Sequence, residues 1–138
     1  MRIVVDTNVF VSGVFFAGPS YTILDAWRLG IVHIVVSPDI LDEYRRVGDE
    51  LAERFSPVSL QPMLELLATT AIHVRSRPLS RQVCSDPDDD KFLACALAGK
   101  AKCVITGDRA LLATSGYRGI TVLTPRDFVE RYLKGGRS

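Results

Sequence analysis

Aspartates crowd the segment SDPDDDKFLACAL, positions 85–97, which turns abruptly apolar after its acids. Asp86, with a proline directly after it, fits a helix N-cap followed by proline at the first helical position. Asp88 and Asp89 then fall in the first turn, where the helix dipole favours anions. Asp90 is the acid that capping needs least, so it is a candidate for a chemical role.

Three further acids stand where expected strands end or where the next helix begins. Asp6 ends the apolar run RIVVD, Asp108 lies two residues after KCVIT, and Glu43 falls in the second turn of the helix expected after IVHIVVS. At 100° per residue, Glu43 borders the apolar face of that helix and can point inward, whereas Asp42 faces solvent. Ligands of open α/β sheets bind beyond the carboxyl ends of the strands, so these three acids are predicted to converge there with Asp90.

Four carboxylates brought together without a cation would repel one another and raise one another's pKa values. Oxygen ligands without histidine or cysteine suit Mg²⁺ or Mn²⁺ rather than zinc. The alternative is that these acids serve only turns and helix starts, where aspartate is common, and TGDR around Asp108 is typical of a turn. The spacing is compatible with both interpretations.

The elements that must position these acids alternate between β-branched runs and helical stretches. Strands are expected at 2–6, 31–37, 71–75, 102–106 and 120–124, and helices at 20–30, 37–55, 59–70, 91–99 and 124–133. Ser20 is the expected cap of the first of these helices, and Gly135 and Gly136 are expected to end the last. The alternation predicts an α/β fold with a mostly parallel sheet of four or five strands covered on both faces.

Length and composition set the broad class. At 138 residues, with 47% hydrophobic and 24% charged residues, the chain is expected to form one soluble domain over 1–138, with the last few residues as a frayed tail. No apolar run approaches the roughly 20 residues of a membrane span, and the start of the chain lacks a secretory signal. The three cysteines form no C-x-x-C pair, so Cys95 and Cys103 are expected to be core thiols in a reducing, cytoplasmic setting.

Four segments of the chain resemble the PIN-domain nucleases and, more narrowly, the VapC-like ribonuclease toxins of bacterial and archaeal toxin–antitoxin pairs. They are VVDTNVFVSG, SPDILDEYRRV, DPDDDKFLACALAGKAKCVITGD and LTPRDFV, and together they cover nearly the whole chain. The first and third segments carry the specific signal. The resemblance implies a PIN-like three-layer α/β/α fold, a Mg²⁺- or Mn²⁺-dependent ribonuclease, a small antitoxin partner and a homodimer.

The resemblance also implies which acids surround the metal. Asp6 matches the first acid of the family, Glu43 the helix glutamate, and Asp108 the acid after the fourth strand. Asp90 matches the Asp-x-x-aliphatic-Ala pattern. Related chains often carry asparagine at this position with aspartate before it, so Asp89 remains a rival ligand.

Two polar residues follow the first acid in the sequence DTN. By the resemblance, Thr7 and Asn8 would lie beside the metal and orient water or phosphate through hydrogen bonds. A cap of the first helix is an equally compatible role for Asn8.

The predicted reaction is metal-assisted hydrolysis of an RNA phosphodiester by in-line attack of water, with the 3′-hydroxyl leaving. Setting four of the 16 acidic residues aside as ligands leaves the others outnumbered by the 17 basic residues, which favours a phosphate-rich substrate. Candidate backbone contacts are Arg45, Arg46, Arg109 and the arginines of the loop 75–82, although a solvated surface role is the general expectation for each. An antitoxin would offer arginine to the carboxylates.

Two other classes of function share some of these sequence features. A non-catalytic PIN fold that binds RNA or protein is the main alternative, and it is disfavoured because all four acidic positions are filled. Aspartyl-phosphate chemistry of the haloacid-dehalogenase kind would require a second aspartate two residues after Asp6, where Asn8 stands. Nucleotide-binding glycine motifs do not occur.

Overall fold

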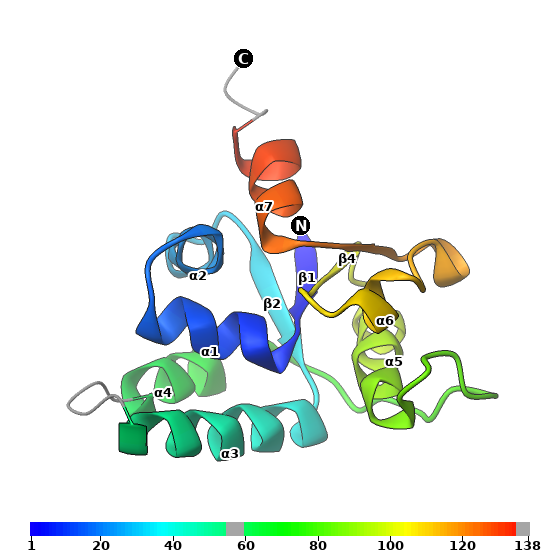
Figure 1. Ribbon diagram of the computed structural model, residues 1–138, viewed down its shortest axis with the longest axis horizontal. Helices are drawn as coiled ribbons and strands as arrows, with labels where there is room; N and C mark the ends of the chain where they lie inside the picture. The colour runs from blue at the N-terminus through cyan, green and yellow to red at the C-terminus, as the bar shows by residue number, and fades with distance from the viewer. Residues whose placement is uncertain (55–59, 135–138) are drawn as a thin grey trace.

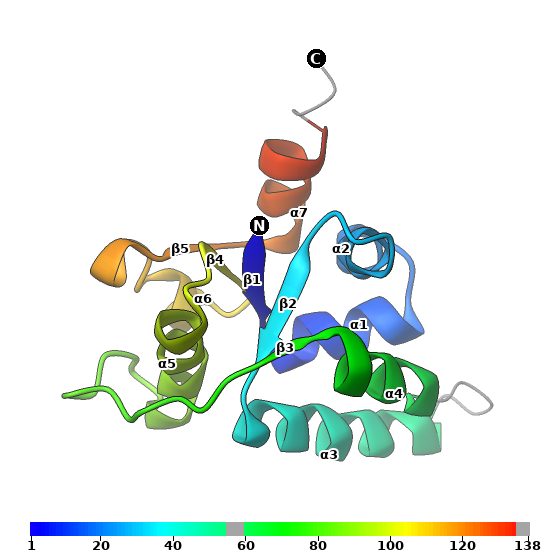
Figure 2. The ribbon, with the colours of Figure 1, turned by 180° about the vertical axis from the view of Figure 1, so that it is seen from behind.

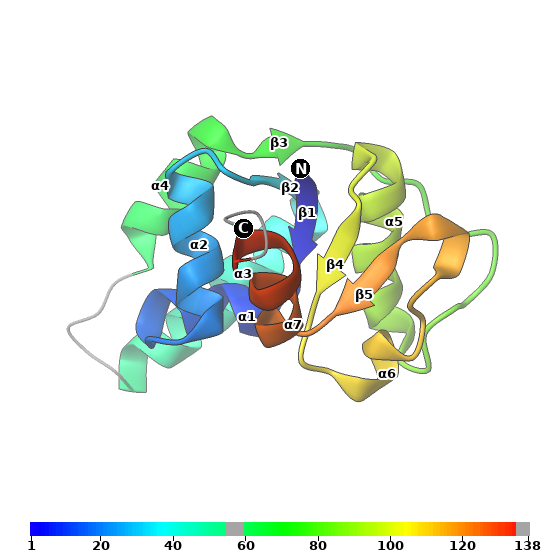
Figure 3. The same ribbon diagram turned by 90° about the horizontal axis from the view of Figure 1, so that it is seen from above.

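The central sheet contains all five strands that the sequence predicts. A computed structural model describes residues 1–54 and 60–134 (Figure 1), and its strands are β1 (Arg2–Val5), β2 (His33–Val36), β3 (Ile72–His73), β4 (Cys103–Ile105) and β5 (Thr121–Leu123). Every neighbouring pair is parallel, and the order across the sheet is β3-β2-β1-β4-β5. The carboxyl ends of all five strands therefore meet at one edge, and β1, with β4 beside it, lies at the centre (Figure 3).

Helices cover both faces of this sheet. The first two crossovers contain α1 (Thr7–Phe15), α2 (Pro19–Arg28), α3 (Pro38–Arg54) and α4 (Gln61–Thr70); the later ones contain η1 (Pro87–Asp89), α5 (Asp90–Gly99), α6 (Arg109–Leu112) and η2 (Tyr117–Gly119). The chain moves outward from β1 to β3 and then returns across the sheet to β4, so right-handed crossovers place α1–α4 on one face and α5 and α6 on the other (Figures 1 and 2). The predicted three-layer α/β/α fold is confirmed.

The last helix begins at a side-chain cap. Thr124 Oγ accepts a hydrogen bond of 3.1 Å from the backbone N–H of Asp127, and α7 (Pro125–Phe128) continues as the π-helical turn η3 (Val129–Lys134). Gly135 and Gly136, expected to end this helix, and the expected tail lie outside the described residues.

The start of α2 differs from the sequence-based expectation. Gly18, not Ser20, takes the N-cap position, and Pro19 is the first helical residue. The backbone of Gly18 has a φ of +126°, which strongly favours glycine, so the backbone conformation places the cap two residues earlier.

Close packing fixes α5 against the sheet. Phe92, Leu93 and Cys95 are buried all round the helix, as its apolar sequence predicts. A Cβ atom added to Gly99 would lie 2.4 Å from Cγ1 of Val35, so only glycine allows this close approach to β2. The tight packing of α5 gives the aspartates at its beginning a defined position relative to the strand ends.

All three cysteines are free and buried in the described core, which confirms the expectation for Cys95 and Cys103 and extends it to Cys84. Across the described residues, none of the helices is by itself long and apolar enough to cross a membrane. Only α1 and α2 taken together reach that length and composition, and the pair is bent by 88°.

Candidate active site

Asp6 stands at the carboxyl end of β1, at the centre of the sheet. Its backbone N–H donates to the carbonyl of Ile105 at 2.9 Å, so this acid lies directly beside the end of β4. Thr106 Oγ1 donates to Oδ2 of Asp6 at 2.5 Å and accepts from the backbone N–H of Asp108 at 3.0 Å. One buried threonine thus links the first acid to the loop that carries the last one.

The end of β1 also anchors α3. The hydroxyl of Tyr44 donates to the carbonyl of Val5, and its ring stacks on Phe10 with centroids 4.4 Å apart. Tyr44 is fully buried, so these contacts set the distance between α3 and the strand end. They also fix the position of its neighbour Glu43.

Glu43 points inward along the edge of the sheet, as its position beside the apolar face predicts. Its side chain is 15% exposed, whereas that of Asp42 is 77% exposed. Thr7 Oγ1 donates to Oε2 of Glu43, and Lys91 Nζ donates to Oε1 at 2.5 Å. Both carboxylate oxygens therefore have partners from other elements.

Lys91 joins Glu43 to a second acid. Its ammonium nitrogen lies 2.7 Å from Oδ2 of Asp88, and its side chain is only 12% exposed. Burial lowers the pKa of Lys91, but the hydrogen bonds to Asp88 and Glu43 outweigh it, so the net pKa is raised and the group stays charged. We call Glu43, Asp88 and Lys91 the Lys91 cluster.

The aspartate-rich segment begins with the cap that the sequence predicts. Asp86 Oδ1 accepts from the backbone N–H of Asp88 at 3.0 Å. This cap opens the 3₁₀ turn η1, and α5 follows from Asp90. The acids of the segment make separate contacts after this point.

Asp90 holds a neighbouring loop. Its Oδ1 accepts from the backbone N–H of Cys84 at 2.7 Å, and its Oδ2 accepts from that of Val83 at 3.1 Å. Burial raises the pKa of Asp90, but these amides outweigh it and the net pKa is lowered. Both of its oxygens are committed to the backbone ahead of η1.

Asp89, the rival ligand, lies beside Asp108 instead. Burial and a hydrogen bond with the carboxyl of Asp108 raise the pKa of Asp89 to about 7, and the charges of Asp86 and Asp6 add to the effect. Burial and the neighbouring acids thus both disfavour the charged form of Asp89.

The pKa of Asp6 is raised as well. Burial raises it and outweighs the hydrogen bonds from Thr106 and the backbone of Asn8, and the charges of Glu43 and Asp108 raise it further. Within the described residues, no lysine, arginine or histidine forms an ion pair with Asp6, Asp89 or Asp108. We call these three acids the Asp6 cluster.

The supporting residues of the DTN sequence have different environments. Thr7 is buried and bonded to Glu43, whereas Asn8 is exposed. Asp6, not Asn8, takes the N-cap position of α1. The alternative role of Asn8 as a helix cap is therefore wrong.

The carboxylates lie near one another at the carboxyl edge of the sheet, but they do not form a preformed metal-binding site. Among residues 1–54 and 60–134, no three acidic, histidine or cysteine side chains are placed to hold a metal ion as they stand. The donor set of the Asp6 cluster, oxygen only and under-neutralised, nevertheless fits a hard divalent cation.

The fold is an open parallel α/β sheet with acids at its carboxyl edge, the edge at which sheets of this class bind their ligands. The family profile of the PIN domain matches residues 2–110, so the chain belongs to the PIN-domain family. It is also 31% identical, over 147 residues, to the uncharacterised protein MJ1680 of Methanocaldococcus jannaschii, covering 97% of this chain and 93% of that protein. PIN domains are generally nucleases.

Two residues of this site were not singled out from the sequence. Lys91 stands three positions after Asp88, a spacing that signals a possible ion pair on one helix face. Its bond to Glu43, 48 positions away, has no local signal. Thr106 ends a predicted strand, and only the pairing of β1 with β4 brings it to Asp6.

Proposed function

We propose that this protein is an endoribonuclease that depends on Mg²⁺ or Mn²⁺ and hydrolyses RNA phosphodiester bonds. The observation that carries the proposal is the Asp6 cluster, three acids that the described residues leave without a cationic partner at the carboxyl edge of a PIN fold. Burying such groups together costs stability unless they serve a bound cation.

The proposed ligands are Asp6, Glu43, Asp108 and one acid of the aspartate segment. The sequence pattern favours Asp90 for that place, but the backbone amides already occupy both of its oxygens. Asp89 is the better candidate because it lies beside Asp108. Asp90 then acts as a positioning residue that fixes the start of α5.

The residues of the chain divide the remaining tasks. Asp6, Asp89 and Asp108 supply the under-neutralised oxygens, and Thr106 orients the oxygen atoms of Asp6. Thr7 and Lys91 hold Glu43 in place. A divalent ion, when bound, supplies charge neutralisation for the scissile phosphate and a more acidic water.

The test is incubation of the purified protein with a panel of RNAs in Mn²⁺, Mg²⁺ or EDTA, beside Asp6→Asn and the surface control Asp42→Asn. We expect metal-dependent cleavage by the wild type and by Asp42→Asn, and none by Asp6→Asn. Each protein is first checked for its fold by circular dichroism. Cleavage that persists in Asp6→Asn would remove the proposal.

A non-catalytic PIN module that binds RNA or protein is the second candidate. The observation in its favour is that Lys91 already forms ion pairs with Glu43 and Asp88, as a structural cation would. Thermal melting distinguishes the two candidates, because a functional metal site raises the melting temperature with Mn²⁺ or Mg²⁺. Asp6→Asn should abolish that rise.

The narrower proposal is that the nuclease is the toxin of a toxin–antitoxin pair, cytoplasmic and homodimeric. Its support is the resemblance of the DTN and DPDDDKFLACA segments to VapC-like toxins. Induced expression in a bacterial host should arrest growth, and Asp6→Asn should relieve the arrest. Co-expression of a short upstream reading frame that restores growth would identify the antitoxin.

A further inference from the structure

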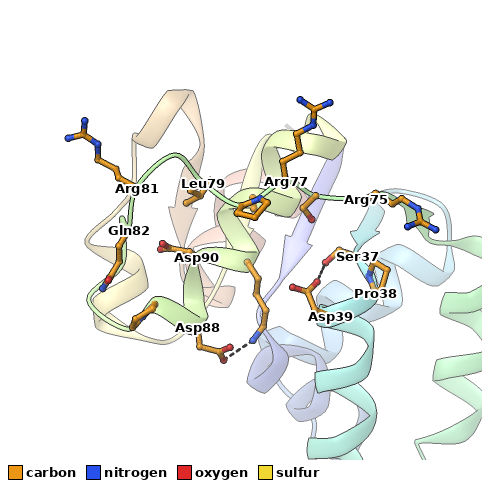
Figure 4. Close-up of a pocket in the computed structure, with 15 residues that line it drawn as sticks. Ser37, Pro38, Asp39, Arg75, Arg77, Leu79, Arg81, Gln82, Asp88 and Asp90 are labelled. Carbon is orange, nitrogen blue, oxygen red and sulfur yellow. Dashed lines mark hydrogen bonds and ion pairs between the residues drawn. The ribbon is translucent and has the colours of Figure 1, made fainter.

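A pocket of about 650 Å³ opens beside the Lys91 cluster (Figure 4). Three parts of the chain line it: the beginning of α3, the basic loop 75–82, and the turn from η1 into α5. Lys91 and Asp88 belong both to this lining and to the Lys91 cluster. The pocket is therefore continuous with the candidate active site.

The walls combine apolar surface with a few polar groups. Pro38, Pro78, Leu79 and Ala94 supply apolar surface, as is usual in pockets that take flat organic groups. Ser76 also belongs to the lining, and its hydroxyl oxygen is the one buried side-chain polar atom without a hydrogen-bond partner among the described residues. A polar edge of an occupant can supply that missing partner.

The acidic side chains at the pocket have partners within the protein, whereas the basic side chains of the loop have no ion-pair partner among the described residues. The acids there are committed: Asp39 accepts from Ser37 at 2.5 Å and from its own helix backbone, and Asp88 pairs with Lys91. The loop arginines, by contrast, make no ion pair with any described residue; they are Arg75, Arg77 and Arg81. Figure 4 shows their side chains spread outward at the rim, where the backbone of a bound polyanion would run.

We propose that this pocket receives one base of the single-stranded RNA substrate, while the three loop arginines hold the phosphates on either side of that nucleotide. The proposal rests on the ribonuclease function proposed above and assigns it a substrate subsite. The apolar walls take the faces of the base, and Lys91 lies at the boundary between the pocket and the acids. The phosphate after the bound nucleotide is thereby directed toward the strand ends.

The test measures RNA binding separately from cleavage. In the Asp6→Asn background, a fluorescein-labelled single-stranded RNA of mixed sequence is titrated by anisotropy, together with copies in which a single abasic nucleotide is moved along the strand. We expect one abasic position to weaken binding about tenfold, the scale of one lost base contact. Ala94→Met, which fills the pocket without changing charge, should weaken binding of the intact RNA equally and erase the abasic effect. Ser76→Ala should weaken it a few-fold.

The arginines are tested with a matched triple variant. Arg75→Ala, Arg77→Ala and Arg81→Ala together should reduce the slope of log affinity against log salt by about 2, since each phosphate contact to a single strand contributes about 0.7. The control removes the same charge from exposed positions elsewhere, with Arg28→Ala, Arg126→Ala and Arg131→Ala, and should change the slope far less. All variants are compared at equal melting temperature or corrected for the folded fraction.

The outcomes separate the two proposals. The base subsite would be overturned if the two triple variants had equal slopes of log affinity against log salt. It would also be overturned if Ala94→Met left the effect of the abasic nucleotide unchanged. Both results hold whether or not the wild type cleaves RNA. Tight binding of an acidic protein partner with no RNA binding would overturn it too. If the wild type binds RNA through the pocket but cleaves no RNA, the proposed ribonuclease function is wrong and the proposed base subsite is retained.

Discussion

Two groups of acids lie side by side at the carboxyl edge of the sheet, and their surroundings are opposite. In the Lys91 cluster, an ammonium group 2.5 Å from Glu43 and 2.7 Å from Asp88 forms an ion pair with each acid, and the guanidinium of Arg46 lies 3.8 Å from Glu43. In the Asp6 cluster, Asp89 and Asp108 share a hydrogen bond, and the pKa of Asp89 is raised to about 7.

The difference shows that closeness of carboxylates is not by itself a sign of a metal site. Acids that pair with a cation of the same chain are stabilised by that ion pair. Acids without one destabilise the folded protein unless a cation from solution binds there. The neighbouring acids Asp89 and Asp90 differ in the same way. Asp90 is stabilised as an anion by two amides and Asp89 is not.

The largest difference in activity is expected between variants that neutralise Asp89 and Asp90 one at a time. Asp89→Asn should lower the rate of RNA cleavage by about 100-fold or more, because a carboxylate ligand of the proposed metal ion is lost. Asp90→Asn should retain metal-dependent melting and most of the activity of the folded protein. Initial rates with Mn²⁺ and melting curves with and without metal measure both. The opposite order of effects would return the ligand role to Asp90.

Removal of the internal cation should lower the stability of the fold. Lys91→Met keeps the length of the side chain but leaves Glu43 partly buried with only the exposed guanidinium of Arg46, 3.8 Å away, as a counter-charge, which should lower the free energy of unfolding by about 2 kcal/mol. Urea denaturation at neutral pH without metal measures this loss. The double variant Lys91→Met/Glu43→Gln should recover part of it, and no recovery would mean that Lys91 acts through packing alone.

Removal of the two backbone bonds of Asp90 tests its role as a positioning residue. Asp90→Ala leaves the amides of Val83 and Cys84 without their acceptors, at a cost of about 2 kcal/mol by urea denaturation. The melting response to Mn²⁺ should persist in the folded protein. A fully stable Asp90→Ala would show that these hydrogen bonds do not hold the loop.

The Asp6 cluster should also give the metal-free protein a pH dependence. The pKa of Asp89 in the folded state, about 7, exceeds its unfolded value of roughly 3.9, so the folded protein retains a proton that the unfolded chain releases. Stability should therefore fall as the pH rises from about 4 to about 7, by about 1 kcal/mol after allowance for solvent screening. Asp89→Asn should lack this fall in EDTA. An identical pH profile for wild type and variant would contradict the surplus charge.

The smallest effect is expected at the exposed member of the Lys91 cluster. The side chain of Asp88 is 70% exposed, so Asp88→Asn should change the free energy of unfolding by less than about 1 kcal/mol. It should leave the position of Glu43 intact, because Thr7 and Lys91 still hold that side chain. A loss as large as that of Lys91→Met would mean that the two acids act as one unit.

The sequence was sufficient for the architecture because hydrophobic periodicity is local. The runs around Val4, Val35 and Val104 are apolar on both faces, which only a covered parallel strand requires, and α5 is apolar all round because both its sides are buried. The inward direction of Glu43 followed from helix geometry in the same way. The cap of α2 was misplaced because the unusual backbone of Gly18 leaves only a weak mark in the sequence.

By itself, the sequence determined the order of strands and helices, the family, and the edge of the sheet at which the acids gather. The strands and helices depend on patterns within a few residues of one another, and the family and the edge depend on short motifs at the ends of those elements, so a single chain displays them directly. Only the tertiary structure decided which acid faces which partner. Lys91 reaches Glu43, and Asp89 rather than Asp90 lies beside Asp108, because strands and helices distant in the chain pack at fixed separations, and electrostatic interactions depend on those separations.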